Sequence, residues 1–182
     1  MNRQLRGTWT VVLVLCLVGC PASAEEGEIV AVEIGETSNL TAHEGSIYFG
    51  GQPAAEDFGL FAERGVKTVI NLRTAEEVER LGFDEQATVE SAGMRYVHVP
   101  IGREEPSEDT LSQLMELLEE DESRPVLLHC GSSNRVGYVW GLYQGARQGK
   151  SVDEAVEEGK AAGLRSSTLE EWLRQYLAGR EP

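Results

Sequence analysis

Short apolar runs alternate with longer amphipathic stretches from residue 47 to the end of the chain. Four runs have the length and composition of buried strands: 47–49, 66–72, 96–99 and 126–129. Between them, apolar residues recur at the i, i+3, i+4, i+7 spacing of a helix face, for example at Leu111, Leu114, Met115 and Leu118. This pattern predicts helices over 54–64, over 74–92 with a break near Gly82, around 111–118, after Val136, from Ser151 and from about Thr168. Thr74 with Glu77 and Ser151 with Glu154 have the spacing of a capping box at two of these helix starts.

Alternation of strands and helices is typical of βαβ units. It predicts an α/β fold with a central, mostly parallel sheet flanked by helices. In such sheets, binding sites lie at the carboxyl ends of the strands. Residues 25–45 precede this pattern, and they are acidic and rich in turn-forming residues, with one possible strand at 29–32. We therefore expect an acidic leader or edge segment over 25–45 and one folded domain over 46–182.

The first 24 residues have the features of an export signal. Arg3 and Arg6 precede the apolar stretch 8–19 (TWTVVLVLCLVG), which is too short to span a bilayer as a typical helix. Its end can be interpreted in two ways. LVGC resembles a bacterial lipobox in which Cys20 is lipidated and anchors the protein to the membrane, whereas Ala-Ser-Ala before Glu25 fits ordinary cleavage. An uncleaved anchor is a third alternative, and each places the domain in the periplasm or outside the cell.

Charge and cysteine content narrow the possible partners. The chain of 182 residues has 16 basic and 31 acidic side chains, a net charge of −15; without Arg3 and Arg6 the balance is 14 against 31, or −17. This charge argues against nucleic acid and against anionic lipid surfaces as general partners. Of the three cysteines, only Cys130 lies beyond the signal, which excludes an internal disulfide in the mature domain.

The segment HCGSSNRVG (129–137) joins an apolar strand to an amphipathic helix. A loop in this position can turn its backbone N–H groups inward and, together with the start of the following helix, bind an anion. Residues 131–134 are small enough for a tight loop, and Asn134 tolerates left-handed backbone angles better than most residues. Arg135 adds a planar fork of donors suited to a tetrahedral oxyanion. The same groups favour the thiolate form of Cys130, so the loop can activate a nucleophile and hold the group that it attacks.

Three segments, in this order, resemble the Cys-dependent tyrosine and dual-specificity phosphatase superfamily. They are IYFGGQPAAEDFGLFAERGVKTVINLR, GMRYVHVPI and PVLLHCGSSNRVG, and together they cover roughly residues 46–147. Within the superfamily, the chain is similar to the bacterial phosphatase-like domain named for beta-lactamase hydrolase-like proteins. The resemblance implies a protein tyrosine phosphatase-like fold over 46–182. It also implies metal-free hydrolysis of a phosphomonoester, carried by a small molecule or a phosphoprotein.

The resemblance assigns roles to the residues of the loop. Cys130 would accept the phosphoryl group as a phosphocysteine, and Arg135 would clamp its oxygens. The amides that would line the phosphate site are those of Gly131, Ser132, Ser133, Asn134 and Arg135. His129 matches a histidine that orients and acidifies the nucleophile, with an ordinary buried strand-end histidine as the alternative. Arg73 matches a position near the phosphate site, and an ion pair with a glutamate three or four residues further on explains it nearly as well.

The loop departs from the superfamily pattern in three ways. Four residues separate the cysteine from the arginine, where the usual loop has five. The similar bacterial domain shares this spacing, but single-domain rhodaneses, which carry sulfur as a cysteine persulfide, also have a short loop. The usual glycine within the loop is replaced by Ser133 or displaced to Gly131. The hydroxyl residue that commonly follows the arginine is here Val136, which predicts slow hydrolysis of the intermediate unless Ser132 or Ser133 compensates.

The general acid departs from the pattern too. Phosphatases of this superfamily protonate the leaving oxygen with an aspartate on the loop after the preceding strand. Here that loop is 101–106 (IGREEP), which contains no aspartate. Glu104 or Glu105 is the expected acid, with Asp109 as a further candidate. The alternative is that these carboxylates only complement the dipole of the helix that follows.

The sequence predicts an exported phosphatase, and alternatives from other functional classes stay open. One is sulfur transfer through a persulfide on Cys130, and another is a module that binds phosphate or phosphoproteins with little or no turnover. If the loop is only a tight turn, Cys130 is a buried apolar side chain and Arg135 makes a surface salt bridge. The three histidines, His43, His98 and His129, lack the spacing of a metal site, so no metal or cofactor is expected.

Overall fold

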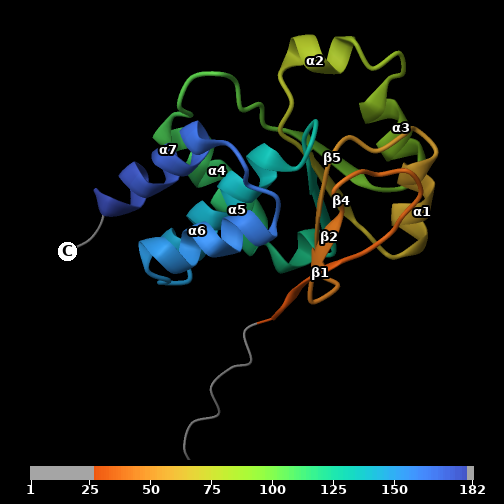
Figure 1. Cartoon of the computed structure of the whole chain (residues 1–182). Coiled ribbons are helices and arrows are strands. Elements are labelled where there is room, and N and C mark those ends of the chain that lie inside the picture. The colour runs from red at the N-terminus through yellow and green to blue at the C-terminus, as the bar shows by residue number, and fades with distance from the viewer. Residues whose placement is uncertain (1–26, 180–182) are drawn as a thin grey trace, which may run out of the picture.

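The computed structural model describes residues 27–179. The predicted export signal over 1–24, including Cys20, lies outside the described residues. Residues 27–179 form a six-stranded sheet with helices on both faces (Figure 1). Within this range, no helix is long and apolar enough to cross a membrane.

The sheet combines a parallel part with an antiparallel edge. Its strands are β1 Ile29–Ala31, β2 Thr41–His43, β3 Ile47–Gly50, β4 Thr68–Asn71, β5 Arg95–His98 and β6 Val126–His129. Their order in the sheet is β1-β2-β3-β6-β4-β5. Strands β3, β6, β4 and β5 are parallel, and β2 and β1 extend the sheet antiparallel to β3. The predicted mostly parallel central sheet is confirmed.

Helices cover both faces of this sheet. They are α1 Asp57–Glu63, α2 Ala75–Glu79, α3 Glu85–Ser91, α4 Glu108–Glu119, α5 Asn134–Ala146, α6 Val152–Ala161 and α7 Ser167–Ala178, with a short 3-10 helix at Asp121–Ser123. Figure 1 shows α1 and α3 on one face and α4 to α7 on the other, with α2 above the end of the sheet. The two layers of helices explain why strands β3, β4 and β6 are buried at every position rather than at alternate ones.

Successive strand residues point into two different cores. Ile70 and Leu128 pack with residues of α4 to α7, whereas their neighbours Val69 and Leu127 pack with residues of α1 and α3. All four side chains are fully buried. This alternation follows from the two-residue period of a strand.

Several predicted boundaries are confirmed. The 74–92 stretch divides at Gly82, whose φ of 79° favours glycine, into α2 and α3. The capping boxes formed by Thr74 with Glu77 and by Ser151 with Glu154 are both present at the starts of α2 and α6. Local capping chemistry therefore sets where these helices begin.

Helix α1 begins at Asp57, later than the predicted 54. Asp57 is buried, and its carboxylate accepts hydrogen bonds from the Ala54 N–H (3.1 Å), the Glu36 N–H (3.2 Å) and the Thr37 hydroxyl (2.8 Å). The bond to Ala54 holds the residues before the helix in a turn. The bonds to Glu36 and Thr37 join the acidic 25–45 segment to the domain, where its described part supplies β1 and β2.

Helix α5 packs so closely on the connection between α6 and α7 that position 137 requires glycine. A Cβ atom there would lie 2.2 Å from the Leu164 nitrogen and 2.3 Å from the Gly159 carbonyl oxygen. We expect Gly137→Ala to lower the free energy of unfolding by at least about 2 kcal/mol, because backbone must shift to admit the methyl group. Urea unfolding followed by circular dichroism measures the change.

Gly59→Ala is the matched control for this substitution. Gly59 lies within α1, and no atom lies within 4 Å of the Cβ that alanine would add. The control should keep or raise the stability, by up to about 1 kcal/mol, because alanine is the better helix former. A Gly137→Ala variant as stable as the wild type would contradict the packing described here.

Candidate active site

The HCGSSNRVG segment lies at the centre of the parallel part of the sheet. Strand β6, between β3 and β4, ends at His129, and Cys130 follows it before α5 begins at Asn134. The parallel strands end at the same edge, so the segments after β4 and β5 run close to the loop. The Leu72 N–H donates to the His129 carbonyl (2.9 Å), and the Ile101 N–H donates to the Leu72 carbonyl (3.0 Å). Cys130 is 1% exposed, with a free thiol.

The connection between α6 and α7 braces the loop. Ser133 adopts the left-handed conformation, with φ of 67°, and its hydroxyl donates to the Ala162 carbonyl (2.8 Å). The Asn134 side-chain oxygen accepts from the backbone N–H groups of Arg165 (2.7 Å) and Ser166 (3.0 Å). The left-handed residue is thus Ser133 rather than Asn134, which the sequence favoured. Asn134 serves instead as an acceptor that fixes the loop from outside.

The backbone of the loop presents N–H groups that have no protein partner. In the described chain, the amides of Gly131, Ser132, Asn134 and Arg135 donate to no protein acceptor. Those of Asn134 and Arg135 also belong to the first turn of α5, where the helix dipole favours negative charge. This arrangement has the features of an anion-binding cradle around the end of β6.

Arg135 lies over this loop and is held from several sides. Its guanidinium donates to both carboxylate oxygens of Glu77 (2.7 and 2.8 Å) and to the carbonyl oxygens of Ile101 (2.9 Å) and Leu72 (3.3 Å). Burial alone would lower the pKa of Arg135, but hydrogen bonding to Glu77 and electrostatic interaction with Cys130 and Glu77 raise it. The guanidinium therefore stays charged beside the thiol.

Glu77 contacts Arg135, which its sequence context did not indicate. Its carboxylate accepts from the Thr74 N–H (2.8 Å) within the capping box and from Arg135 as a bidentate partner. Hydrogen bonding from Arg135, opposed by partial burial, lowers the pKa of Glu77 to about 2. The capping box was visible in the sequence, but its carboxylate also positions Arg135, 58 residues further along the chain.

Glu77→Gln tests this pair through the pH dependence of stability. Because the folded pKa of about 2 lies below the ordinary 4.5, the pair stabilises the fold fully above pH 4.5, and this stabilisation is lost as pH falls toward 2. Since Glu77 is partly exposed, we expect a loss of roughly 1–2 kcal/mol at pH 7 rather than the full linkage value. Urea unfolding at pH 7 and pH 3 measures the difference between wild type and variant.

The control for this prediction is Glu79→Gln, an exposed carboxylate on the same helix. It should change the stability little at either pH. If the wild type and Glu77→Gln differed in free energy of unfolding by the same amount at both pH values, the carboxylate charge would not be what stabilises the pair.

Arg73, predicted near the phosphate site, connects Glu77 to a second set of polar residues. Its Nη2 donates to the Glu77 carbonyl (3.0 Å), and its Nε lies 3.9 Å from the Glu77 carboxylate. Its Nη1 donates to the side-chain oxygen of Gln52 (2.5 Å). The ion pair with a glutamate four residues further on is thus present, and Glu77 links Arg73 to Arg135. A place for Arg73 at the phosphate site stays a prediction.

A buried polar network lies behind Cys130. The His129 ring is fully buried, and its Nε2 lies 3.1 Å from a carboxylate oxygen of Glu85, which is 1% exposed. The two Glu85 oxygens also accept from the side-chain amides of Asn71 and Gln52 (2.6 Å each). Burial raises the pKa of Glu85, but His129 and these hydrogen bonds outweigh it and lower the pKa overall. The histidine therefore lies against an ionised carboxylate.

Three members of this network, Gln52, Asn71 and Glu85, were not singled out from the sequence. Gln52 belongs to the FGGQP segment, and its position after a strand at the same sheet edge was an available signal. Asn71, a fully buried polar residue in the apolar run of β4, was another. Glu85 follows an N-cap aspartate, where carboxylates are common, so its sequence context carried no signal of burial.

The predicted general acids lie on the loop between β5 and α4. Glu104 and Glu105 are exposed. The pKa of Tyr138 on α5 is raised mainly by burial of Tyr138 and next by the charge of Glu105. Asp109 is exposed in the first turn of α4. The loop is tied to the site at its base, because the Ile101 carbonyl accepts from Arg135.

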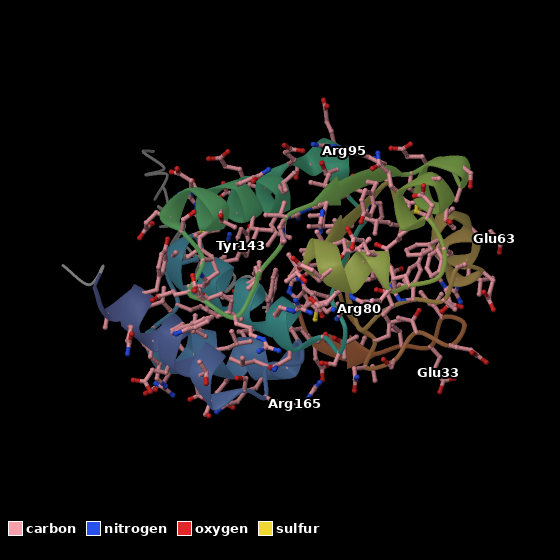
Figure 2. The ribbon with its side chains drawn as sticks, turned by 90° about the horizontal axis from the view of Figure 1, so that it is seen from above. Glu33, Glu63, Arg80, Arg95, Tyr143 and Arg165 are labelled. Atoms are coloured by element: carbon pink, nitrogen blue, oxygen red, sulfur yellow. The ribbon has the colours of Figure 1, made fainter. Side chains whose placement is uncertain are left out.

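A cavity of about 640 Å³ opens beside Arg135. We call it the Arg80–Arg103 cavity. Its lining comes from α2 and the residues before it, from the 101–106 loop, and from Arg135 itself: Thr74, Glu76, Glu77, Arg80, Gly102, Arg103 and Arg135. The two arginines that give the cavity its name are exposed side chains on different segments. Figure 2 looks onto this end of the molecule, with Arg80 beside α2.

Comparison with known proteins shows the family of this chain. Residues 25–174 match the family model described as DSP-PTPase phosphatase fused to NAD+ kinase. A beta-lactamase hydrolase-like protein of Xylella fastidiosa is 32% identical over 127 residues, which are 69% of this chain and 29% of that relative. The chain therefore spans less than a third of the length of this relative.

Solved structures share the fold. P. aeruginosa TpbA has a TM-score of 0.65 at 24% identity, covering 87% of this chain and 92% of that one. A DUF442 protein of Shewanella putrefaciens CN-32 has a TM-score of 0.66 at 21% identity, with 80% and 92% covered. The predicted tyrosine phosphatase-like fold is confirmed. Because the family model covers most of the residues, this chain belongs to the DSP-PTPase family, within the Cys-dependent tyrosine and dual-specificity phosphatase superfamily.

Proposed function

We propose that the domain hydrolyses a phosphomonoester through a phosphocysteine on Cys130. The observation that carries this proposal is the meeting of a buried thiol, unpartnered loop amides and the Arg135 guanidinium at one sheet edge. A Cys-to-Ser variant of P. aeruginosa TpbA, 22% identical with a TM-score of 0.56, has been crystallised in complex with pTyr. That complex supports a phosphorylated substrate for this chain.

The reaction has two displacement steps at phosphorus. The Cys130 thiolate attacks the phosphorus atom, an S–P bond forms as the P–O ester bond breaks, and the leaving oxygen takes a proton from a general acid. Water then attacks the phosphocysteine and gives a proton to the carboxylate that acted as the acid; the S–P bond breaks, inorganic phosphate is released and the thiolate is restored. Arg135 and the loop amides stabilise the negative charge on the phosphoryl oxygens in both steps.

We assign the general acid to Glu104 or Glu105. Both belong to the loop whose first residue, Ile101, accepts a hydrogen bond from Arg135, and they are the exposed carboxylates on that loop. If this assignment is right, Glu→Gln at the acting position should lower kcat/KM, which reports the first step, more for phenyl phosphate, a substrate with a poor leaving group, than for 4-nitrophenyl phosphate. Equal effects on the two substrates for both variants would exclude both glutamates.

The second step should be the slower one. Val136 is fully buried in the core and has no hydroxyl to assist departure of the thiolate. The Ser133 hydroxyl is buried and donates to the Ala162 carbonyl. Ser132, which is exposed, remains as the loop hydroxyl free to assist. Phosphocysteine is therefore expected to accumulate during turnover.

Hydrolysis of 4-nitrophenyl phosphate by the wild type and by Cys130→Ser tests the proposal. We expect kcat/KM to fall by at least about 10³-fold in the variant, because serine is a far weaker nucleophile at neutral pH. Equal activity of the two proteins would contradict the assignment of Cys130.

A further inference from the structure

The Arg80–Arg103 cavity adjoins the cradle, because Arg135 belongs to both. Three arginines and two glutamates line the cavity. One of these glutamates, Glu77, is already bonded to Arg135 and lies close to Arg73. Cationic groups thus outnumber anionic ones here, in a chain whose net charge is −15. The local charge is opposite to that of the molecule as a whole.

Arg80 and Arg103 form no ion pair with any carboxylate in the described part of the chain. Arg95, Arg147 and Arg174 each pair with a carboxylate, whereas Arg64 and Arg165 donate only to backbone carbonyl oxygens. What distinguishes Arg80 and Arg103 is that both line one cavity beside Arg135. The pKa of Glu76, the other carboxylate of the lining, is lowered first by hydrogen bonding to its own backbone and to Thr74, and less by the charge of Arg80, with which it forms no ion pair. The two guanidinium groups therefore remain available to a ligand.

We propose that the Arg80–Arg103 cavity is a second anion subsite, which holds a further phosphate group of a compact, polyphosphorylated small molecule while Cys130 attacks the first. This inference rests on the proposed function and names its substrate class. A monophosphate over the cradle would leave both arginines unused. A volume of about 640 Å³ lies in the range of small-molecule sites, about 300–1,000 Å³. Arg80 and Arg103 lie on two different segments, and their planar guanidinium groups can donate hydrogen bonds to several phosphate oxygens at once.

The test compares inorganic phosphate and tripolyphosphate as competitive inhibitors of 4-nitrophenyl phosphate hydrolysis. For the wild type, we expect tripolyphosphate to bind at least about tenfold more tightly, because the additional phosphates gain charge-assisted hydrogen bonds. In Arg80→Ala/Arg103→Ala, the ratio of the two inhibition constants should fall below about threefold. A ratio near one in the wild type, or an unchanged ratio in the double variant, would overturn the proposal.

Arg64→Ala/Lys67→Ala is the matched control. It also removes two positive charges, but from exposed positions between α1 and β4, at the opposite end of the sheet. The wild-type ratio should be retained in this control; a fall equal to that in the first double variant would show that only net charge matters, which would overturn the subsite. Circular dichroism confirms that both double variants fold.

Calorimetric binding to Cys130→Ser separates this proposal from the proposed function. Suppose that the wild type hydrolyses no phosphate ester, but Cys130→Ser binds tripolyphosphate more tightly than phosphate and loses this preference without Arg80 and Arg103. That result would support the second anion subsite and contradict the proposed hydrolysis. The same calorimetry compares a doubly phosphorylated peptide with its singly phosphorylated form. If the second phosphate raised the affinity of the peptide as much as tripolyphosphate exceeds phosphate, the proposal of a small-molecule substrate would be overturned.

Discussion

Arg135→Lys should lower kcat/KM for an aryl phosphate by roughly 10²–10³-fold, the loss typical of removing a transition-state donor. Lysine keeps the positive charge but replaces the planar fork by a point charge. In the wild type, the Glu77 carboxylate accepts hydrogen bonds from two guanidinium nitrogens of Arg135, and the Ile101 and Leu72 carbonyl oxygens accept from one of these nitrogens. One ammonium group cannot satisfy these four acceptors and a phosphoryl group as well. The steady-state rates of purified wild type and variant measure the loss.

Two comparisons make this prediction specific. Arg64→Lys, at an exposed position that donates only to the Leu60 carbonyl, should keep wild-type kcat/KM. Glu77→Gln should lower kcat/KM less than Arg135→Lys, because the fork remains but loses its charged partner. If Arg135→Lys retained more than about a tenth of wild-type kcat/KM, a simple positive charge would suffice and the fork geometry would have no special role.

Glu85→Gln is expected to lower the free energy of unfolding by about 2–3 kcal/mol, the cost typical of leaving buried hydrogen-bonding groups without their partner. The fully buried His129 ring loses its carboxylate neighbour at 3.1 Å. Gln52 and Asn71 donate to different oxygens of Glu85, so the amide introduced by Glu85→Gln turns an N–H group toward one of these donors. Urea unfolding at pH 7 measures the change.

The same variant has a defined pH dependence. Because the folded pKa of Glu85 is lowered, the carboxylate stabilises the fold above its ordinary range near 4.5, and this contribution is lost as pH falls. The stability gap between wild type and Glu85→Gln should therefore narrow in acid. Glu90→Gln, an exposed position on the same helix, is the control and should be nearly neutral at every pH. A Glu85→Gln protein as stable as the control at pH 7 would contradict a charged network behind the loop.

The elements that sequence alone predicted are those set by local patterns. Apolar runs such as 126–129 indicate strands because both faces of the sheet are covered by helices. The capping boxes at Thr74 and Ser151 mark helix starts within a few residues of chain. The nucleophile, the arginine and the loop between them are also local, since residues 129–137 contain all of them.

The supporting residues were not predicted because their partners are distant in sequence. Glu85 meets Gln52 across 33 residues, and Glu77 meets Arg135 across 58. A glutamate at the start of a helix has a sufficient local explanation, so nothing in its context indicates a second role. The left-handed position at Ser133 was missed for a related reason. Propensity favoured Asn134, whereas the fold uses the Asn134 side chain to bind the backbone of Arg165 and Ser166.

The most direct test of the account is mass-spectrometric peptide mapping after acid quench of the wild type during turnover of 4-nitrophenyl phosphate. The account predicts a phosphate adduct on the peptide that contains Cys130, absent from Cys130→Ser and stronger in a Ser132→Ala variant, in which the remaining loop hydroxyl is removed. A parallel reaction with thiosulfate should leave the same peptide unmodified. Turnover without any adduct on Cys130, or a sulfur adduct formed from thiosulfate in place of the phosphate adduct, would contradict the phosphocysteine mechanism.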